Sequence, residues 1–419
     1  MKRRALILGL PLMLAAMQDA GAMSFGSFDP RAMAMGGAGV AAGTSANASF
    51  YNPALLAASR SDEDFSLELP VIGVRLADPD ELISSLDDYQ KAKYEDAMSS
   101  AITQWNNAAT PAELLAAKNA VVTAGGNLVN GLTTLSNKAL EADINAGMVV
   151  GIPSRHWGTA FYANARAIGG SLLDITQSDL NSVNSTITTL QNLDLTGLTD
   201  SSANQLTDPT TNLTSSVQAR GAVVTEVGIS LAREFNVGGN DIALGITPKY
   251  QVVDTFDYIV NVDTGDITAD QGKKSYKNLN LDMGLAHDFS DGWKAGLVVK
   301  NMMSKSYTTV LGNTIQVKPQ ARVGLAYAGS FAAAALDVDL TKNKGTGFDS
   351  DSQYASLGAE LNAWHLFQFR VGYHHNLSNS DTDSASLGFG LSPLGIHLDL
   401  AVVGSNKEVG VGLQTGFRF

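Results

Sequence analysis

The sequence has no cysteine and comparatively little charge. Its 419 residues include 28 Lys and Arg and 41 Asp and Glu, and the absence of Cys excludes disulfides, thiolate zinc sites and cysteine nucleophiles. Charged residues make up 16% of the chain, against about 25% in soluble domains, which disfavours an ordinary charged-surface cytosolic enzyme. The net charge of −13 argues against a nucleic-acid partner, since binding phosphates needs a basic surface.

Long apolar runs are missing, except at the N-terminus. Basic residues at positions 2–4 precede an apolar run over 5–17, and small residues follow at 20–22. We therefore expect residues 1–22 to be a signal peptide cleaved after Ala22, rather than a buried N-terminal helix. No later stretch approaches the ~18–20 consecutive apolar residues of a membrane-spanning helix. Any part of the mature chain that spans a membrane must therefore do so as strands.

From residue 65 onward, apolar and polar residues alternate. Val223, Val227 and Ile229 are apolar, for example, whereas Glu226 and Ser230 lie between them. This period of two is typical of strands. The runs predict about fourteen strands, several of them near the ~9–11 residues that a tilted transmembrane strand needs. They lie within segments 65–74, 142–152, 157–167, 217–235, 242–246, 279–285, 293–299, 323–327, 336–340, 357–361, 367–373, 387–391, 396–402 and 409–419.

The links between these runs alternate between short and long, which is typical of bacterial outer-membrane barrels with short periplasmic turns and longer external loops. Only the last link, 404–407, is short where a long one is expected. We predict an all-β fold over residues 65–419, a transmembrane antiparallel barrel that is closed because lipid tolerates no open sheet edge. Both chain ends lie on the side of the short turns, so we expect them to be periplasmic. A large soluble β-sandwich or propeller is the alternative.

Two of the long links are expected to contain helices. Asp78–Glu81 and Thr110–Glu113 each supply a capping acceptor, then Pro at the first helical position, and Glu three residues after the cap. We therefore predict a helical hairpin outside the barrel within insertion 76–138. Its apolar stripes either pack on each other or form a groove that first catches a lipid-like ligand. The Ser-, Thr- and Asn-rich loop 170–216 is expected to be partly helical.

The last predicted strand ends in an aromatic residue. Val411, Leu413, Phe417 and the terminal Phe419 share one face. A terminal aromatic on an alternating strand resembles the signal that outer-membrane assembly machinery reads. We therefore expect that machinery and outer-membrane lipid to be partners of the chain.

The segment between the signal and the first strand is rich in small residues. Gly36, Gly37 and Gly39 stand in a Gly/Ala-rich stretch, and Asn52–Pro53–Ala54 follows shortly before the first strand. No Gly-Lys-Ser/Thr follows, so this is not a phosphate loop. The pattern resembles the N-terminal hatch of FadL-type outer-membrane transporters of hydrophobic compounds. The FadL-related TraF-like family of conjugal-transfer proteins is the nearest match, a resemblance that includes Leu69–Arg75 and the acidic helix opening after it.

This resemblance implies that residues 23–64 form a hatch inside the barrel. Small residues suit that place, because a segment threaded through the lumen must approach the wall closely. The lumen itself is expected to be polar, with charges of both signs that favour ion pairs holding a plug over an ion-selective pore. The predicted lumen residues are Arg220, Glu226, Asp282, Lys300, Arg322, Asp337, Glu360, Arg370 and Asp399.

Pro248 falls on the lipid-facing phase of a predicted strand. Proline removes a ladder hydrogen bond there, so a gap could open sideways; a harmless bulge is the alternative. The resemblance to FadL-type proteins implies capture outside, hatch movement and lateral release. We therefore predict passive uptake of hydrophobic, fatty-acid-like molecules, with Asn52–Pro53–Ala54 anchoring the hatch. The competing hypothesis is a non-enzymatic scaffold in a conjugation or secretion assembly.

Catalytic motifs are missing. The six histidines lie in no His-Glu-x-x-His or other metal-ligand spacing, and no Gly-x-Ser-x-Gly elbow is present. The sequence therefore predicts no enzymatic activity, metal or cofactor.

Overall fold

The computed structural model describes residues 25–419 except positions 27, 59–63, 212, 262–271, 290–291, 349–350, 365 and 380–381. The predicted signal peptide lies outside the described residues, as do residues 262–271 in the link between the predicted strands at 242–246 and 279–285. No helix in the described part of the chain is long and apolar enough to cross a membrane.

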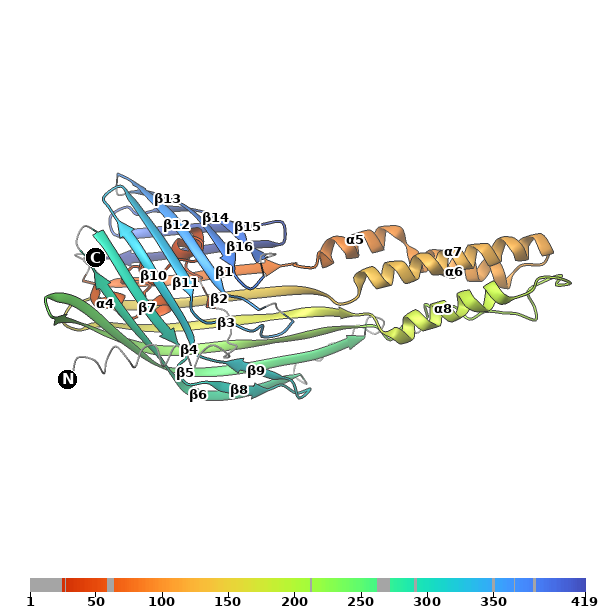
Figure 1. Cartoon of the computed structure of the whole chain (residues 1–419), viewed down its shortest axis with the longest axis horizontal. Helices are drawn as coiled ribbons and strands as arrows, with labels where there is room; N and C mark the ends of the chain where they lie inside the picture. Colours follow the sequence, from red (N-terminus) through yellow and green to blue (C-terminus); the bar gives the residue numbers. More distant parts are fainter. Residues whose placement is uncertain are drawn as a thin grey trace.

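Fourteen antiparallel strands form a closed barrel, as predicted (Figure 1). Consecutive barrel strands pair with each other, and the first pairs with the last. Each predicted run lies in one of them. The strands are β1 (Ser66–Ala77), β2 (Lys138–Ile152), β3 (Gly158–Asp174), β4 (Ser216–Val237), β5 (Asn240–Asn261), β6 (Lys273–Asp288), β7 (Trp293–Lys300), β10 (Gln320–Ala328), β11 (Ala332–Asp339), β12 (Tyr354–Ala363), β13 (Phe367–Asn376), β14 (Ser384–Leu391), β15 (Ile396–Gly404) and β16 (Glu408–Arg418).

The two faces of the wall have opposite character. Arg370 and Asp399 point inward and are buried, whereas their neighbours Val371 and Leu400 are exposed on the outside. Apolar side chains outside and polar ones inside are the reverse of a water-soluble domain and fit a wall bathed in lipid. Exposed aromatic side chains gather at the short-turn end, as in the interfacial belts of membrane proteins. They include Trp157, Phe235, Trp293, Tyr327, Phe331, Trp364 and Phe419.

The wall is much taller on one side than on the other. Strands β4 and β5 have 22 residues each, whereas β11 and β14 have 8. At about 3.3 Å per residue, these lengths correspond to roughly 70 Å and 26 Å along the strand. In Figure 1 the long strands lead toward the helices, at the end opposite the C-terminus. The tall side therefore extends beyond the ends of the short strands and supports the helical insertion.

The insertion contains α5 (Leu82–Ala92), α6 (Tyr94–Asn106) and α7 (Pro111–Leu135). The prediction of the first helix is wrong in two respects: where the helix starts, and that it is one uninterrupted helix. It begins at Leu82, because the Asp78 carboxylate accepts hydrogen bonds from the amides of Leu82 and Ile83 while Glu81 is left-handed. A second left-handed residue, Lys93, then separates α5 from α6.

The start of α7 is confirmed. The Thr110 hydroxyl accepts a hydrogen bond from the Glu113 amide at 3.3 Å. The Glu113 carboxylate accepts one at 2.8 Å from the Ala109 amide, one residue before the position that a capping box uses. The hydrogen bond from the Ala109 amide, followed by hydrogen bonding from Thr110 to the carboxylate, lowers the pKa of Glu113.

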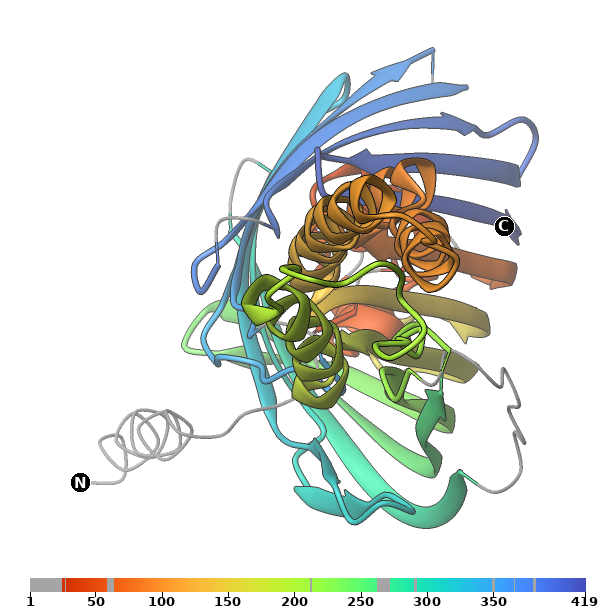
Figure 2. The same cartoon turned by 90° about the vertical axis from the view of Figure 1, so that its right-hand side faces the viewer.

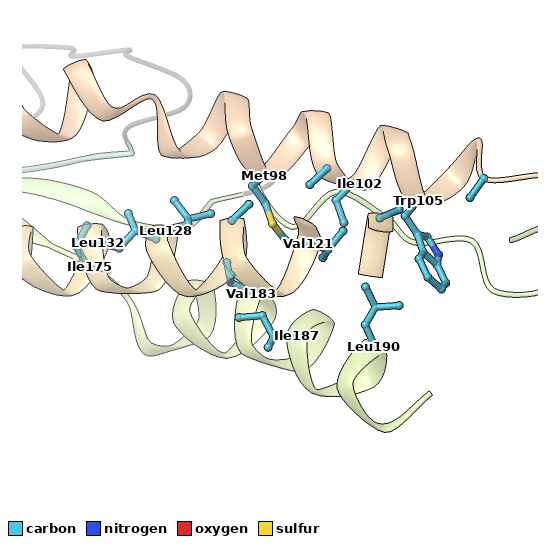
Figure 3. Packing of buried hydrophobic residues seen from close by; sticks show 14 of the residues in the cluster. Met98, Ile102, Trp105, Val121, Leu128, Leu132, Ile175, Val183, Ile187 and Leu190 are labelled. Atoms are coloured by element: carbon cyan, nitrogen blue, oxygen red, sulfur yellow. The ribbon is translucent and has the colours of Figure 1, made fainter. Parts of the chain in front are cut away.

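A further helix, α8 (Gln177–Asn192), lies in the partly helical loop predicted after β3 and completes a bundle with α6 and α7. Met98, Trp105, Val121 and Leu190 point into its core (Figure 3). The Trp105 indole donates a hydrogen bond to the Asn204 carbonyl at 2.7 Å. The apolar stripes thus pack on each other and on α8, which is the first of the two predicted arrangements.

Candidate functional site: a plugged lumen

The N-terminal segment 25–58, here called the hatch, lies inside the ring of strands (Figure 2). It contains three short helices, α2 (Pro30–Ala34), α3 (Ala48–Tyr51) and α4 (Leu55–Ala58). The Asp29 carboxylate caps α2 by accepting hydrogen bonds from the amides of Arg31 and Ala32. Helix α2 packs against β13–β16, and α4 against β3–β6. The hatch therefore spans the lumen and contacts opposite sides of the wall.

Glycines line the wall where the hatch touches it. A Cβ atom on Gly358 would overlap Met35, one on Gly372 would overlap the Gly36 amide, and one on Gly245 would overlap the backbone of Pro53 and Ala54. Similar conflicts with hatch atoms arise at Gly284, Gly296 and Gly388. The hatch backbone thus lies directly on the backbone of the barrel. A side chain at these wall positions requires the hatch to move.

The predicted hatch glycines lie in a turn after α2. Gly36 and Gly37 have φ angles of 69° and 93°, a region that favours glycine. The Gly37 amide donates to the Ala32 carbonyl at 2.7 Å, and the Gly39 amide donates to Asp337 Oδ2 at 2.8 Å. Two of the three glycines therefore permit the backbone turn, and the third binds the wall.

The predicted anchor Asn52 joins the two halves of the hatch to the barrel. Its Nδ2 donates to the carbonyls of Val40 and Leu285, each at 3.0 Å, and its Oδ1 accepts from the Ala54 amide at 3.1 Å. The side chain is fully buried. This single amide thus connects the early hatch, the late hatch and strand β6.

All nine predicted lumen residues face inward, and four of them bind the hatch. Glu360 accepts from Arg31 Nε at 2.9 Å, and Asp337 accepts from two hatch amides, including that of Val40. Arg322 donates to the Gly37 carbonyl at 3.2 Å, and Lys300 to the Phe50 carbonyl at 2.9 Å. The other five pair with the wall and are Arg220, Glu226, Asp282, Arg370 and Asp399.

The ion pairs form networks rather than isolated contacts. Arg370 donates to Glu360 at 2.7 Å and to Asp399 at 2.5 Å, which extends the hatch contact across β12, β13 and β15. Lys249 lies 3.1 Å from Glu226 and 3.0 Å from Asp282. Most of these charges have a partner of opposite sign, so the described lumen residues present both signs side by side rather than a track of one charge. This arrangement fits a held plug better than an ion-selective pore.

Sequence reasoning missed several partners in these networks: Arg31, Lys249, Asp257 and Asp339. Lys249 and Asp257 lie on the inward phase of β5, so the alternation used for the other strands could have found them. Arg31 lies in the hatch, where no alternation exists to indicate its direction. Among the described residues, no group of three or more His, Asp or Glu is placed to hold a metal ion.

The β8 (Lys305–Thr308) and β9 (Thr314–Val317) hairpin occupies a link that was predicted only as a loop. Its Tyr307 and Ile315 are buried against inward-facing residues of the tall side, among them Val224 and Val253. The Tyr307 hydroxyl donates to Asn278 Oδ1 at 2.7 Å. The hairpin therefore folds into the mouth of the barrel and narrows it.

Two cavities lie on the helical side of the hatch. The outer cavity has an empty volume of about 610 Å³, part of it open to solvent, and is lined by Phe25, Phe28 and Met33 of the hatch and by wall residues that include Val74 and Val403. The wall cavity, of about 620 Å³, lies against β3, β4, β5 and β7 and is more polar. Its lining includes Ser49, Phe50, Tyr162, Asn164, Glu226, Lys249 and Lys300.

Pro248 faces outward and is exposed, at an interruption of the β4–β5 pairing. Residues 229–230 and 247–248 form no pair with each other between β4 and β5, although β4–β5 pairing continues on both sides of them and each pairs with its other neighbouring strand. On the inner face, the Ser230 hydroxyl donates to Ser49 of the hatch at 2.8 Å and lies 2.8 Å from the Thr247 hydroxyl. Side-chain hydrogen bonds thus close from within a place where the backbone ladder is interrupted.

These features define a class of protein, the outer-membrane β-barrel whose lumen is plugged by its own N-terminal segment. The family follows from the sequence: residues 49–339 match the family model described as "F plasmid transfer operon, TraF, protein", and the chain belongs to this family. A comparison with curated proteins found no match.

Solved structures with a similar fold include the toluene transporter TodX of Pseudomonas putida, at 10% identity and a TM-score of 0.47 over 94% of this chain and 99% of that chain. A TodX deltaS2S3 mutant has 9% identity and a TM-score of 0.49, over 94% of this chain and 99% of that chain. The CymD monoaromatic hydrocarbon channel has 12% identity and a TM-score of 0.33, over 95% of this chain and 99% of that chain. The family match confirms the expected resemblance to TraF-like proteins. At these identities, the likeness to the channels concerns the fold alone.

Proposed function

We propose that this protein lets small hydrophobic molecules cross the outer membrane passively, without a catalytic step. The observation that carries the proposal is the outer cavity, an apolar-lined space that ends on the hatch inside an otherwise plugged barrel. The charges around it are paired, Arg75 with Glu408 and Arg166 with Asp143. A cavity lined in this way suits an apolar, fatty-acid-like molecule better than a free ion.

The proposed exit is sideways, at Pro248. A molecule that leaves the lumen there breaks fewer backbone hydrogen bonds, because residues 229–230 and 247–248 form no β4–β5 pair, and it also parts the hydroxyl contacts of Ser49, Ser230 and Thr247. At most other places in the wall it would have to break paired backbone hydrogen bonds, which are costly to leave unmade in lipid. The pairing of β1 is also interrupted, at Leu69 and Pro70, but the wall cavity lies against β4 and β5. In this proposal Asn52 keeps the late hatch attached to β6 while residues near Ser49 move.

The first test asks what the cavity retains. The refolded full chain in detergent is incubated with a mixture of fatty acids and hydrocarbons, and the retained molecules are identified by mass spectrometry. Val403→Phe fills the outer cavity, whereas Val402→Phe adds the same volume on the lipid-facing side of the same strand. We expect selective retention by the wild-type chain and by Val402→Phe, and loss in Val403→Phe. Equal retention by all three chains would contradict the proposed site.

The second test concerns the exit. Pro248→Val supplies the missing backbone donor and allows the β4–β5 ladder to close. Uptake of a retained molecule into proteoliposomes should fall in this variant, while retention in detergent stays unchanged. Unchanged uptake would remove the lateral route and leave Pro248 as a harmless interruption.

The family match also supports a second candidate, a scaffold in a conjugation assembly. The observation that favours it is the external bundle, which stands on the tall side of the wall and has a fully packed core of its own. A donor strain that lacks this protein would then lose conjugation, and the transport-deficient Val403→Phe chain would restore it. Conjugation that depends on an open outer cavity would argue against a purely structural role.

We further propose that the chain ends are periplasmic and that assembly machinery reads Phe419. This residue is exposed and stacks on Phe417, with ring centroids 6.5 Å apart, at the aromatic end of the wall. Phe419→Ala should lower the amount of folded protein in the outer membrane without changing refolding of the purified chain in detergent. An equal defect in both assays would indicate a role in folding instead.

A further inference from the structure

The outer cavity and the wall cavity meet at a small set of residues. Of all the residues that line either space, only Gly26, Phe28 and Arg166 line both. The outer cavity also shares Arg75, Asp143 and Tyr354 with a further space beneath the external loop at residues 344–345. A molecule that enters below this loop therefore reaches Phe28 before it reaches Ser49 and the wall beside Pro248.

The position of Arg166 is fixed by the wall. Its Nε donates to Asp143 Oδ1 at 3.0 Å and its Nη2 donates to Asp143 Oδ2 at 2.6 Å, a two-pronged ion pair between β3 and β2. The guanidinium carbon lies 4.7 Å from the centroid of the Phe28 ring, within the range of a cation–π contact. The phenyl ring therefore rests on a rigid, charged support.

The backbone of Phe28 is also fixed. It is followed directly by Asp29, the cap of α2, and its carbonyl oxygen lies 3.1 Å from where a Cβ on Gly73 of β1 would be. The ring is less enclosed than the backbone, since the residue is only half-buried. Gly26 lies against this ring, because a Cβ added there would overlap it. The ring is therefore the part of this constriction that can rotate while the backbone of the hatch stays in place.

We propose that Phe28, held over Arg166, is a selectivity gate between the outer cavity and the wall cavity. This inference rests on the proposed function, because it names the step that selects which molecules cross. It assigns the first barrier on the route to a single ring rather than to movement of the whole hatch. Molecules small enough to pass when the ring rotates cross to the wall beside Pro248, and larger ones stay in the outer cavity.

The natural absence of cysteine allows a direct test. A single cysteine is placed either in the wall cavity, as Asn164→Cys, or in the outer cavity, as Ser356→Cys. The rate of reaction with N-ethylmaleimide is measured on the full chain in intact outer membranes, with the reagent added from outside. Heat-modifiable gel mobility shows which variants have folded. In the parent chain, we expect Ser356→Cys to react faster than Asn164→Cys.

Phe28→Ala removes the barrier and should raise the Asn164→Cys rate about tenfold, since loss of a desolvated cation–π contact has an effect of this order, while the Ser356→Cys rate stays constant. Phe28→Trp should lower the Asn164→Cys rate. Gly26→Ala, which displaces the ring without altering it, should raise that rate too. These last two variants keep the test decisive if Phe28→Ala fails to fold.

The matched control is Phe348→Ala. Phe348 lies over Arg220 with a similar distance of 4.8 Å, but it belongs to an external loop and lines neither cavity. The gate would be overturned if the Asn164→Cys rate stayed the same in every Phe28 and Gly26 variant. It would also be overturned if Phe348→Ala accelerated this rate as much as Phe28→Ala does. Because labelling requires no transport, a chain that shows the gate but takes up no hydrophobic molecule would refute the proposed function alone.

Discussion

The ion pair between the hatch and the wall predicts what holds the plug in place. Glu360 accepts hydrogen bonds from both Arg31 and Arg370, whose side chains are only 16% and 4% exposed. Glu360→Gln keeps the shape of the side chain but removes the negative charge that pairs with both guanidinium groups. Removing one partner of a buried pair costs about 3–5 kcal/mol. Because Arg31 is slightly exposed and Arg370 keeps Asp399, we expect the lower limit, about 3 kcal/mol.

A loss of this size shifts the ratio of docked to released hatch about 100-fold, since each 1.4 kcal/mol is a factor of ten. Hydrogen exchange at the amides of α2, measured on the refolded full chain in detergent, should therefore accelerate by about that factor. Asp87→Asn is the matched control, because its pair with Lys91 is exposed on both sides and such pairs contribute at most about 0.5 kcal/mol. Exchange in Glu360→Gln that matches the control would refute the reasoning.

The contacts of the hatch and the bundle allow further predictions. Gly372→Ala should displace the hatch and destabilise the barrel by about 1–3 kcal/mol, measured by thermal unfolding. Gly126→Ala, with nothing within 4 Å of the new Cβ, should instead stabilise α7 by about 0.5–1 kcal/mol; equal effects would contradict the proposed backbone contact. The buried Asp179 carboxylate accepts bonds from Thr214 and Ser215; burial raises its pKa, but these bonds outweigh burial and lower it. The stabilisation is therefore present above about pH 4 and is lost as the pH falls through the lowered pKa. Trp105 fluorescence during acid titration should show this loss in the wild-type bundle and not in Asp179→Asn. The substitution itself should lower the stability of the bundle by about 2 kcal/mol at neutral pH. Identical titrations of the two chains would refute the assignment.

The barrel was accessible to sequence reasoning because strand alternation is local. Each run of period two shows by itself which residues face the lumen, so the inward direction of Arg322, Asp337 and Glu360 followed from their neighbours in sequence. The same holds for the Thr110 cap, which depends on four consecutive residues. Small residues before the first strand indicated a segment in close contact with another surface, without showing which surface it was.

Only the tertiary structure decided which partners these residues meet. Arg31 and Glu360 are 329 positions apart, and nothing in either local pattern indicates the other. The inward fold of the β8–β9 hairpin and the packing of α8 on α7 likewise depend on segments that are distant in sequence. The sequence by itself therefore determined the strands of the wall and which of their residues face inward, since both depend on local periodicity. The closing of the barrel determined the contacts that hold the hatch and divide the lumen, because these exist only once opposite sides of the wall are brought together.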